Sequence, residues 1–258
     1  TQIQADMLPR IFPAFPERPE FDIYASMTPA KEVGGDFYDF FLMDDDHLAL
    51  VIADVSGKGV PAALFMVIAK TLLKNAAQTG LSPRAVLEKV NNQLCENNEA
   101  EMFVTVWLGV YEISTGKLTA ANAGHEYPAV QRADGAFELY KDRHGFVLAG
   151  MENARYREYE LELGLGDTLF VYTDGVAEAT DGANTLYGTD RMLDALNRRR
   201  DRTPEELLRD MKADIDRFVG GAPQFDDITM LAIQRKPAPP KPAGSPAGPG
   251  APGEGGCV

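Results

Sequence analysis

The sequence predicts an α+β fold in which two mainly antiparallel β-sheets stack face to face, with pairs of helices on the outer faces. This is a four-layer α-β-β-α sandwich. The order of the expected elements is the first observation behind it: strands, two helices, more strands, two helices and a last strand. The second is that the first helix is followed by another helix, so the βαβ alternation of a parallel sheet is missing.

The expected elements follow from hydrophobic patterning and from turn residues. Pro61 suits the first turn of a helix, and Ser82 with Pro83 is a capped helix start. Helix 62–77 is apolar on most faces, so we expect it to be buried. We expect strands 158–163 and 168–173 to pair with each other. The remaining expected strands are 21–27, 37–43, 48–55, 104–113, 117–123 and 228–234, and the remaining expected helices are 83–98, 190–200 and 204–219.

One domain is expected, over residues 15–236. Residues 1–14 are expected to form a linker helix or an N-terminal arm, helical over 1–8 and interrupted by Pro9 and Pro13. Residues 237–258 are mostly Pro, Gly and Ala, and they lack the apolar side chains needed to offset the entropy of ordering. We therefore expect them to form a disordered tail.

Composition excludes several classes of function. The 258 residues carry 39 acidic and 25 basic side chains, a net charge of -14, which would repel nucleic acid and anionic membranes. No apolar run approaches the roughly 20 residues of a transmembrane helix, and no signal peptide is visible. Cys95 and Cys257 lie far apart, so no disulfide framework is expected. This cysteine usage fits the cytoplasm.

Several aspartates lie where expected strands begin or end. Asp54 and Asp174 each end an apolar strand and precede turn residues. Asp36 follows two glycines, and Asp226 with Asp227 opens the last strand. The simpler interpretation, without a functional role, is that each aspartate caps a turn, as Asp often does. The order of the residues along the chain does not by itself show that they converge.

If these carboxylates did converge, they would repel one another unless cations lay between them. Ligands that are all oxygen suit Mg²⁺ or Mn²⁺ better than zinc. Four carboxylates and two divalent ions would balance in charge. The pattern is therefore consistent with a centre of two metal ions, and no convincing Ser-His-Asp or Cys-His arrangement competes with it.

Five short segments, in order along the chain, resemble the signature segments of the bacterial SpoIIE/RsbU-type phosphatases. These are the PP2C-like (PPM) serine/threonine phosphatases of partner-switching pathways. The resemblance extends over about residues 8–235. The segments are 32–39 (EVGGDFYD), 54–63 (DVSGKGVPAA), 122–125 (NAGH), 172–175 (YTDG) and 226–229 (DDIT).

The resemblance implies a PP2C-like sandwich and a site with two Mn²⁺ or Mg²⁺ ions. By position, Asp54 would bridge both ions, and Asp174 and Asp226 would hold one of them. Asp36, directly or through water, and the backbone carbonyl of Val55 would hold the other. A water molecule activated by both ions would attack phosphorus in line.

The resemblance also implies a substrate and partners. The substrate would be a phosphoserine or phosphothreonine on a small regulatory protein, an anti-sigma-factor antagonist of the STAS type. An upstream sensor or dimerising linker is implied as a partner, with a homodimer as one outcome. The chain would then be the cytoplasmic part of a larger signalling protein.

Three further residues each allow two interpretations. Lys31 could contact the substrate phosphate, or it could be a solvated loop lysine. Lys58 lies between two glycines at the start of a helix and is expected to be exposed. His125 could act as a general acid, but a hydrogen-bonded turn residue is the better interpretation.

Two other functions are compatible with parts of the sequence. Residues 57–62 fit the loose G-x-G-x-x-A pattern of dinucleotide-binding proteins, but that fingerprint needs a crossover to a parallel strand, and here a second helix follows. We reject that function. The other is a phosphatase-like binding module that has lost catalysis, against which the presence of all four principal aspartates argues. Metal titration with a phosphoserine peptide would separate the module from the enzyme.

Overall fold

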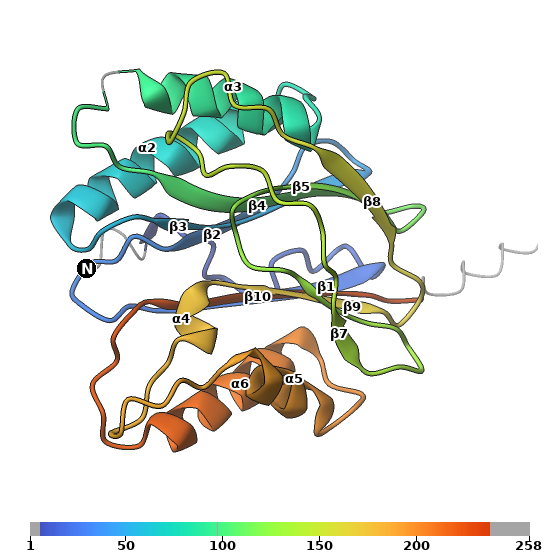
Figure 1. The fold of residues 1–258 in the computed structure, drawn as a ribbon. Helices are drawn as coiled ribbons and strands as arrows, with labels where there is room; N and C mark the ends of the chain where they lie inside the picture. The colour runs from blue at the N-terminus through green and yellow to red at the C-terminus, as the bar shows by residue number, and fades with distance from the viewer. Residues whose placement is uncertain (1–5, 97, 238–258) are drawn as a thin grey trace, which may run out of the picture.

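The computed structural model describes residues 6–96 and 98–237, which form a four-layer sandwich (Figure 1). Sheet A has the strand order β1-β10-β9-β6-β7, and sheet B has the order β2-β3-β4-β5-β8. Neighbouring strands in both sheets are antiparallel. The predicted fold class is confirmed. The strands are β1 (Phe21–Thr28), β2 (Phe37–Leu42), β3 (His47–Val55), β4 (Val104–Glu112), β5 (Lys117–Ala123), β6 (Ala129–Gln131), β7 (Phe137–Leu139), β8 (Glu158–Glu162), β9 (Thr168–Tyr172) and β10 (Ile228–Arg235).

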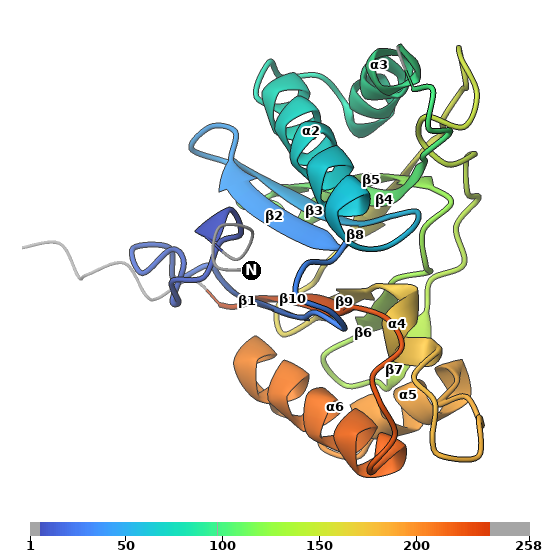
Figure 2. The ribbon, with the colours of Figure 1, turned by 90° about the vertical axis from the view of Figure 1, so that its left-hand side faces the viewer.

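The helices form one pair on each outer face. In Figure 2, α2 and α3 cover sheet B, while α5 and α6 cover sheet A. The short helix α4, which was not predicted, follows β9 directly at one end of the sandwich. The helices are α2 (Val60–Ala77), α3 (Pro83–Cys95), α4 (Asp174–Ala177), α5 (Thr189–Asn197) and α6 (Pro204–Val219).

Strand β10 shows how the layers share the core. Its side chains alternate between the two faces of sheet A, as the geometry of a strand requires. Leu231 and Ile233 join the cluster between the two sheets. Met230 and Ala232 join the second cluster, under α5 and α6. Both faces of the strand are therefore buried, which explains why residues 228–233 read as a nearly continuous apolar run.

The expected pairing of strands 158–163 and 168–173 is wrong, because the two strands belong to different sheets. β8 pairs with β5 in sheet B, and β9 pairs with β10 in sheet A. The chain crosses between the sheets at a turn in which Gly166 has a left-handed φ of 86°. The Asp167 carboxylate fixes this crossing by accepting hydrogen bonds from the Gly164 N–H (2.9 Å) and the Arg132 guanidinium (2.7 Å).

Helix α2 is buried on one face only, so the expectation that it would be buried on most faces is wrong. Ala62 and Met66 are fully buried against sheet B, whereas Val60 and Leu64 are 64% and 62% exposed. Among the described helices, α2 alone is long and apolar enough to cross a membrane by length and composition, a test that the core helix of a soluble protein also passes. This differs from the expectation that no apolar run approaches the length of a transmembrane helix. The helix is tied to β2 by the ion pair between Lys70 Nζ and Asp39 Oδ2, 2.5 Å long.

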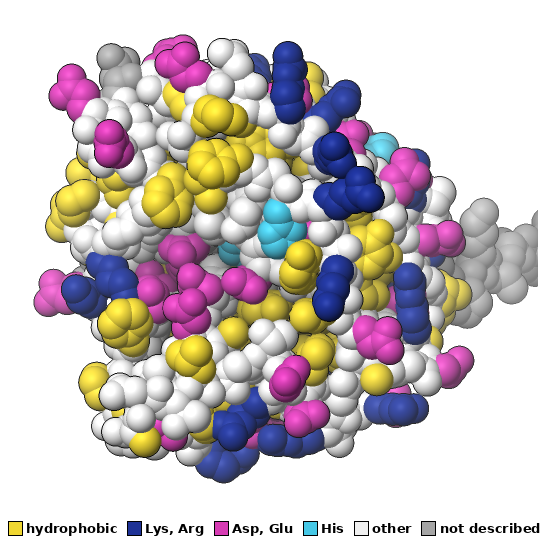
Figure 3. All heavy atoms as spheres, in the orientation of Figure 1, with side chains coloured by type: hydrophobic (Ala, Val, Ile, Leu, Met, Phe, Trp, Pro, Cys, Tyr) yellow, Lys and Arg dark blue, Asp and Glu magenta, His cyan; other side chains and the backbone are white. Residues whose placement is uncertain are grey.

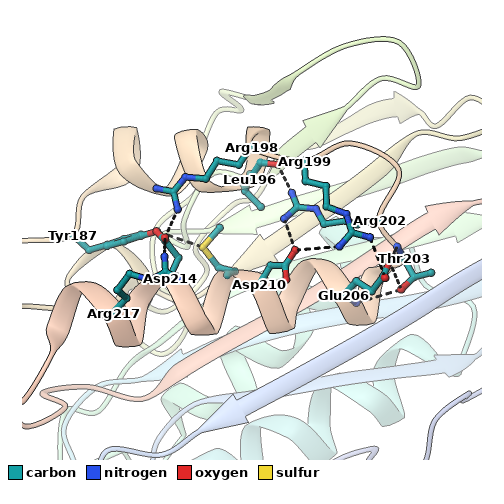
Figure 4. Close-up of polar contacts among 11 residues, drawn as sticks. Tyr187, Leu196, Arg198, Arg199, Arg202, Thr203, Glu206, Asp210, Asp214 and Arg217 are labelled. Atoms are coloured by element: carbon teal, nitrogen blue, oxygen red, sulfur yellow. Dashed lines mark hydrogen bonds and ion pairs between the residues drawn. The ribbon is translucent and has the colours of Figure 1, made fainter.

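The helix pair on sheet A is held together by a polar network around a buried carboxylate (Figure 4). Asp214 of α6 accepts a hydrogen bond from the Tyr187 hydroxyl at 2.6 Å and pairs with Arg198, which follows α5. At its N-terminus, α6 has a capping box in which Thr203 and Glu206 satisfy each other's backbone N–H groups. This network stabilises the packing of the two helices, and it lies on the outer side of sheet A.

The segment before β1 packs onto the sandwich. Leu8 is buried in the core, and the Tyr38 hydroxyl donates to the Pro9 carbonyl at 2.7 Å. The Phe12 ring lies 4.4 Å from the Tyr24 ring, centroid to centroid. Most of the expected helix over residues 1–8 lies outside the described residues. The same holds for the expected tail beyond residue 237.

Candidate active site

Strand register brings the predicted aspartates to one end of the sandwich. Phe37 lies opposite Ala53 in sheet B, so Asp36 and Asp54 are neighbours across the β2–β3 pair. In sheet A, Tyr172 lies opposite Met230, so Asp174 after β9 and Asp226 before β10 lie at the same end. Figure 3 shows acidic side chains gathered in the depression between the two layers. Each sheet thus supplies two of the four carboxylates.

Asp36 joins the two layers through hydrogen bonds. Its side chain is buried, and one oxygen, Oδ2, accepts from the hydroxyls of Thr173 (2.7 Å) and Thr229 (2.6 Å) in sheet A. Burial raises the pKa of Asp36 well above its usual value, and the charge of Asp54 raises it further. The sequence analysis missed both threonines, although each belongs to one of the five signature segments.

The pKa values of two other carboxyls show how closely the acidic groups lie. Burial, followed by the charge of Asp174, raises the pKa of Asp54 to about 7. Burial, followed by the charges of Glu178 and Asp226, raises the pKa of Asp174 to about 6. Asp36 opposes the shift at Asp54, because the two side chains share a hydrogen bond. At neutral pH this end of the protein is therefore a site where a positive ion would be stabilised.

Glycines allow the loops of the site to approach one another. A Cβ at Gly34 would lie 1.7 Å from Asp227 Oδ2, and one at Gly175 would lie 1.9 Å from the Asp227 carbonyl oxygen. A Cβ at Gly35 would lie 2.7 Å from the Val55 carbonyl oxygen. Asp227, which the sequence analysis quoted without a role, also accepts a hydrogen bond from the Ala30 N–H at 2.8 Å. It braces the loop before β2 against sheet A.

Two lysines near the predicted site lie in different settings. Lys31 is exposed in the loop before Asp36, so its predicted contact with phosphate stays a prediction. Lys58 lies on the surface, as predicted, but its side chain is only 33% exposed and its ammonium lies 2.8 Å from Asp226 Oδ2. The sequence analysis missed this ion pair, because the two residues are far apart in the chain.

His125 is a turn residue rather than an exposed acid. It is 3% exposed, its N–H donates to Asn122 Oδ1 at 2.7 Å, and its Nδ1 lies 2.9 Å from Thr105 Oγ1. Burial lowers the pKa of its imidazole to about 3, so the ring is neutral at physiological pH. This agrees with the interpretation that the sequence analysis preferred.

The donors at the site suit hydrated divalent cations. Within residues 6–96 and 98–237, no three His, Cys, Asp or Glu side chains form a group that could enclose one ion. Mg²⁺ usually keeps several waters and binds through one or two carboxylates, so a closed cage is not required. The Val55 carbonyl beside Gly35 adds a further hard oxygen. The residues therefore fit ions held partly by water.

Comparison with known proteins agrees with this fold. The family described as Stage II sporulation protein E (SpoIIE) matches residues 44–236. The chain is 33% identical to Protein IcfG of Synechocystis over 91% of this chain and 40% of that protein. It is 29% identical to the phosphoserine phosphatase RsbU of Bacillus subtilis over 86% of this chain and 65% of that protein. It thus spans less than two thirds of either relative.

A solved structure of similar fold is the SiaA-PP2C domain of Pseudomonas aeruginosa. It superposes with a TM-score of 0.78 at 23% identity, covering 90% of this chain and 93% of that one. The PP2C-like fold and the resemblance carried by the five signature segments are both confirmed. This chain belongs to the SpoIIE family, with the PP2C-like sandwich that its sequence predicted.

Proposed function

We propose that this chain is a metal-dependent protein serine/threonine phosphatase that hydrolyses a phosphoserine or phosphothreonine on a small regulatory protein. The observation that carries the proposal is the convergence of Asp36, Asp54, Asp174 and Asp226 from both sheets. Burial, and then neighbouring carboxylates, raise the pKa values of Asp36, Asp54 and Asp174. The similarity to RsbU, named as a phosphoserine phosphatase, supports the same reaction.

In this proposal, Asp54 would contact both of two Mg²⁺ or Mn²⁺ ions. Asp174 and Asp226 would contact one ion, in part through water, and Asp36, directly or through water, would contact the other together with the Val55 carbonyl. When bound, such ions lower the pKa of water and neutralise charge on the phosphate.

The rest of the chain's contribution is positioning. The Thr173 and Thr229 hydroxyls both donate to Asp36 Oδ2 and so fix the position of this carboxylate. Asp227 and the glycines opposite it keep the loops close together. These contacts hold the carboxylates before the substrate arrives, so little reorganisation is needed during the reaction. No side-chain nucleophile is required.

Substrate and partners are proposed from the family alone. Relatives named RsbU and RsbP support a role in partner switching, and a STAS-type anti-sigma-factor antagonist is the proposed substrate. An upstream sensor or dimerising linker is the proposed regulator, and it would act by shifting α2, which begins soon after Val55. A homodimer and a cytoplasmic location are parts of the same proposal.

Turnover of a phosphoserine peptide is the direct test. We expect hydrolysis in millimolar Mn²⁺ or Mg²⁺ and none in chelator, because every proposed ligand is a hard oxygen. Phosphate release should be measured in both buffers, together with Mn²⁺ binding by calorimetry. Equal turnover in chelator would refute the mechanism. Metal and peptide binding without hydrolysis would favour the inactive binding module.

A second test measures stability without catalysis. We expect Asp174→Asn to be more stable than the parent in chelator at pH 7.5, by about 1 kcal/mol after allowance for the partial exposure of the group. Folding raises the pKa of Asp174 from 3.8 to about 6. The protonated carboxyl therefore contributes stability that is fully present below pH 3.8, and this stability is lost as the pH rises through 6. Asn avoids that loss. In millimolar Mn²⁺ the order of melting temperatures should reverse, since the parent binds the ion better.

The matched control for this test is Asp134→Asn, an exposed turn residue of the same charge. Asp142 lies outside every signature segment but is unsuitable, because its side chain is fully buried and lies 2.9 Å from His144 Nε2. It also accepts a hydrogen bond from Asn122 at 3.1 Å. If Asp174→Asn and Asp134→Asn shift the melting temperature alike in both buffers, the carboxylates do not share a metal site.

A further inference from the structure

Lys58 makes three contacts with Phe225 and Asp226, in the segment before β10. Its Nζ lies 2.8 Å from Asp226 Oδ2 and donates to the Phe225 carbonyl at 2.7 Å. The same ammonium lies 4.0 Å from the centre of the Phe225 ring. The flanking residues Gly57 and Gly59 both have left-handed φ values, 84° and 81°, which a side chain would disfavour. The loop after β3 is therefore shaped to direct this ammonium at the segment before β10.

Both oxygens of Asp226 already have donors. Oδ2 receives the Lys58 ammonium, and Oδ1 accepts the Asp227 N–H at 2.9 Å. A divalent ion on this carboxylate would meet Lys58 on one side and a fixed backbone N–H on the other. Because two cations at such short range repel each other, ion binding at Oδ2 and the ion pair oppose one another. Of the two donors, only Lys58 is on a flexible side chain that can move away.

We propose that Lys58 is a built-in competitor of the divalent cation at Asp226, a positioning residue that sets the metal concentration at which the site fills. The inference rests on the proposed function for the identity of the ion. Without metal, the ammonium neutralises one carboxylate of a crowded group. With metal, it leaves Asp226, and the loop after β3 is released from the segment before β10. Metal binding is thereby coupled to the loop that directly follows Asp54 and Val55 at the end of β3.

The experiment compares Lys58→Met with the parent, because Met keeps most of the side-chain length and removes the charge. We expect Mn²⁺ to bind the variant roughly three- to fivefold more tightly by titration calorimetry, on the scale of a partly exposed ion pair. We also expect the melting temperature of the variant in chelator to fall below that of the parent, since Asp226 loses its counter-ion. In saturating Mn²⁺ this difference should disappear.

Two control variants complete the design. Lys58→Arg keeps the charge and should bind Mn²⁺ as the parent does. Lys117→Met removes a charge at an exposed pair with Glu160, in the β4–β5 hairpin, and should change neither reading. If the parent binds Mn²⁺ and Lys58→Met binds it equally or more weakly, this inference is overturned while the proposed function stands. If neither protein binds Mn²⁺ and neither hydrolyses a phosphoserine peptide, the proposed function fails as well.

Discussion

Replacing Asp54 with Asn is expected to lower turnover of a phosphoserine peptide by about 10²–10³-fold, the scale on which one preorganised electrostatic group contributes to catalysis. The proposed role explains the size of the effect, because Asp54 is the one carboxylate assigned to both ions. Its charge also acts directly on Asp36. A neutral amide at this position would weaken both ion sites at once.

The variant should remain folded, which separates loss of catalysis from loss of structure. Burial raises the pKa of Asp54 to about 7, so near neutral pH an uncharged side chain there costs the metal-free fold little. We therefore expect a melting temperature in chelator at least equal to that of the parent. Asp134→Asn, measured in parallel, should keep full turnover. Near-normal turnover by Asp54→Asn would show that the bridging role belongs to another residue.

Replacing Lys70 with Met is expected to destabilise the domain by about 3–5 kcal/mol, as is usual when one partner of a buried ion pair is removed. Lys70 and Asp39 are 13% and 4% exposed, and their atoms are 2.5 Å apart. Asp39 belongs to the first signature segment, yet in the structure it ties α2 to β2 and pairs with Lys70. Without Lys70, the buried charge of Asp39 would have no counter-ion and would keep the hydrogen bond from the Phe40 N–H at 3.0 Å.

Urea unfolding of a double-mutant cycle tests this account. The double variant Lys70→Met with Asp39→Asn should recover most of the lost stability, because it leaves no unpaired charge. Lys74→Met, one turn along the same helix, removes an ammonium that lies 5.0 Å from the Phe41 ring centre and should cost no more than about 1 kcal/mol. If Lys70→Met costs as little as Lys74→Met, the pair does not support the helix.

What the sequence predicted well was local. Helix starts at Pro83 and Pro204 agree with the structure, because capping residues and proline act on their immediate neighbours. The strand ends that carry Asp54 and Asp174 were also predicted correctly, since an apolar run that stops at a polar turn marks them.

What the sequence did not predict was long-range. The sheet to which β8 belongs depends on pairing with β5, some forty residues earlier in the chain, and no local pattern records it. The exposed face of α2 is apolar, with Val60, Leu64 and Ile68, as is its buried face, so composition could not separate the two faces. The partners of Asp226 and Asp36, Lys58 and Thr229, were missed because only folding makes them neighbours.

The division of the carboxylates between the sheets has a mechanical consequence. Asp36 and Asp54 move with one layer, while Asp174 and Asp226 move with the other. If the proposed mechanism holds, the alignment of the two layers would itself determine the rate, because a slip of about 1 Å between them would displace reacting groups by an amount that can cost a hundredfold. Core residues such as Leu231, between the sheets, would then affect the rate without contacting an ion or the substrate.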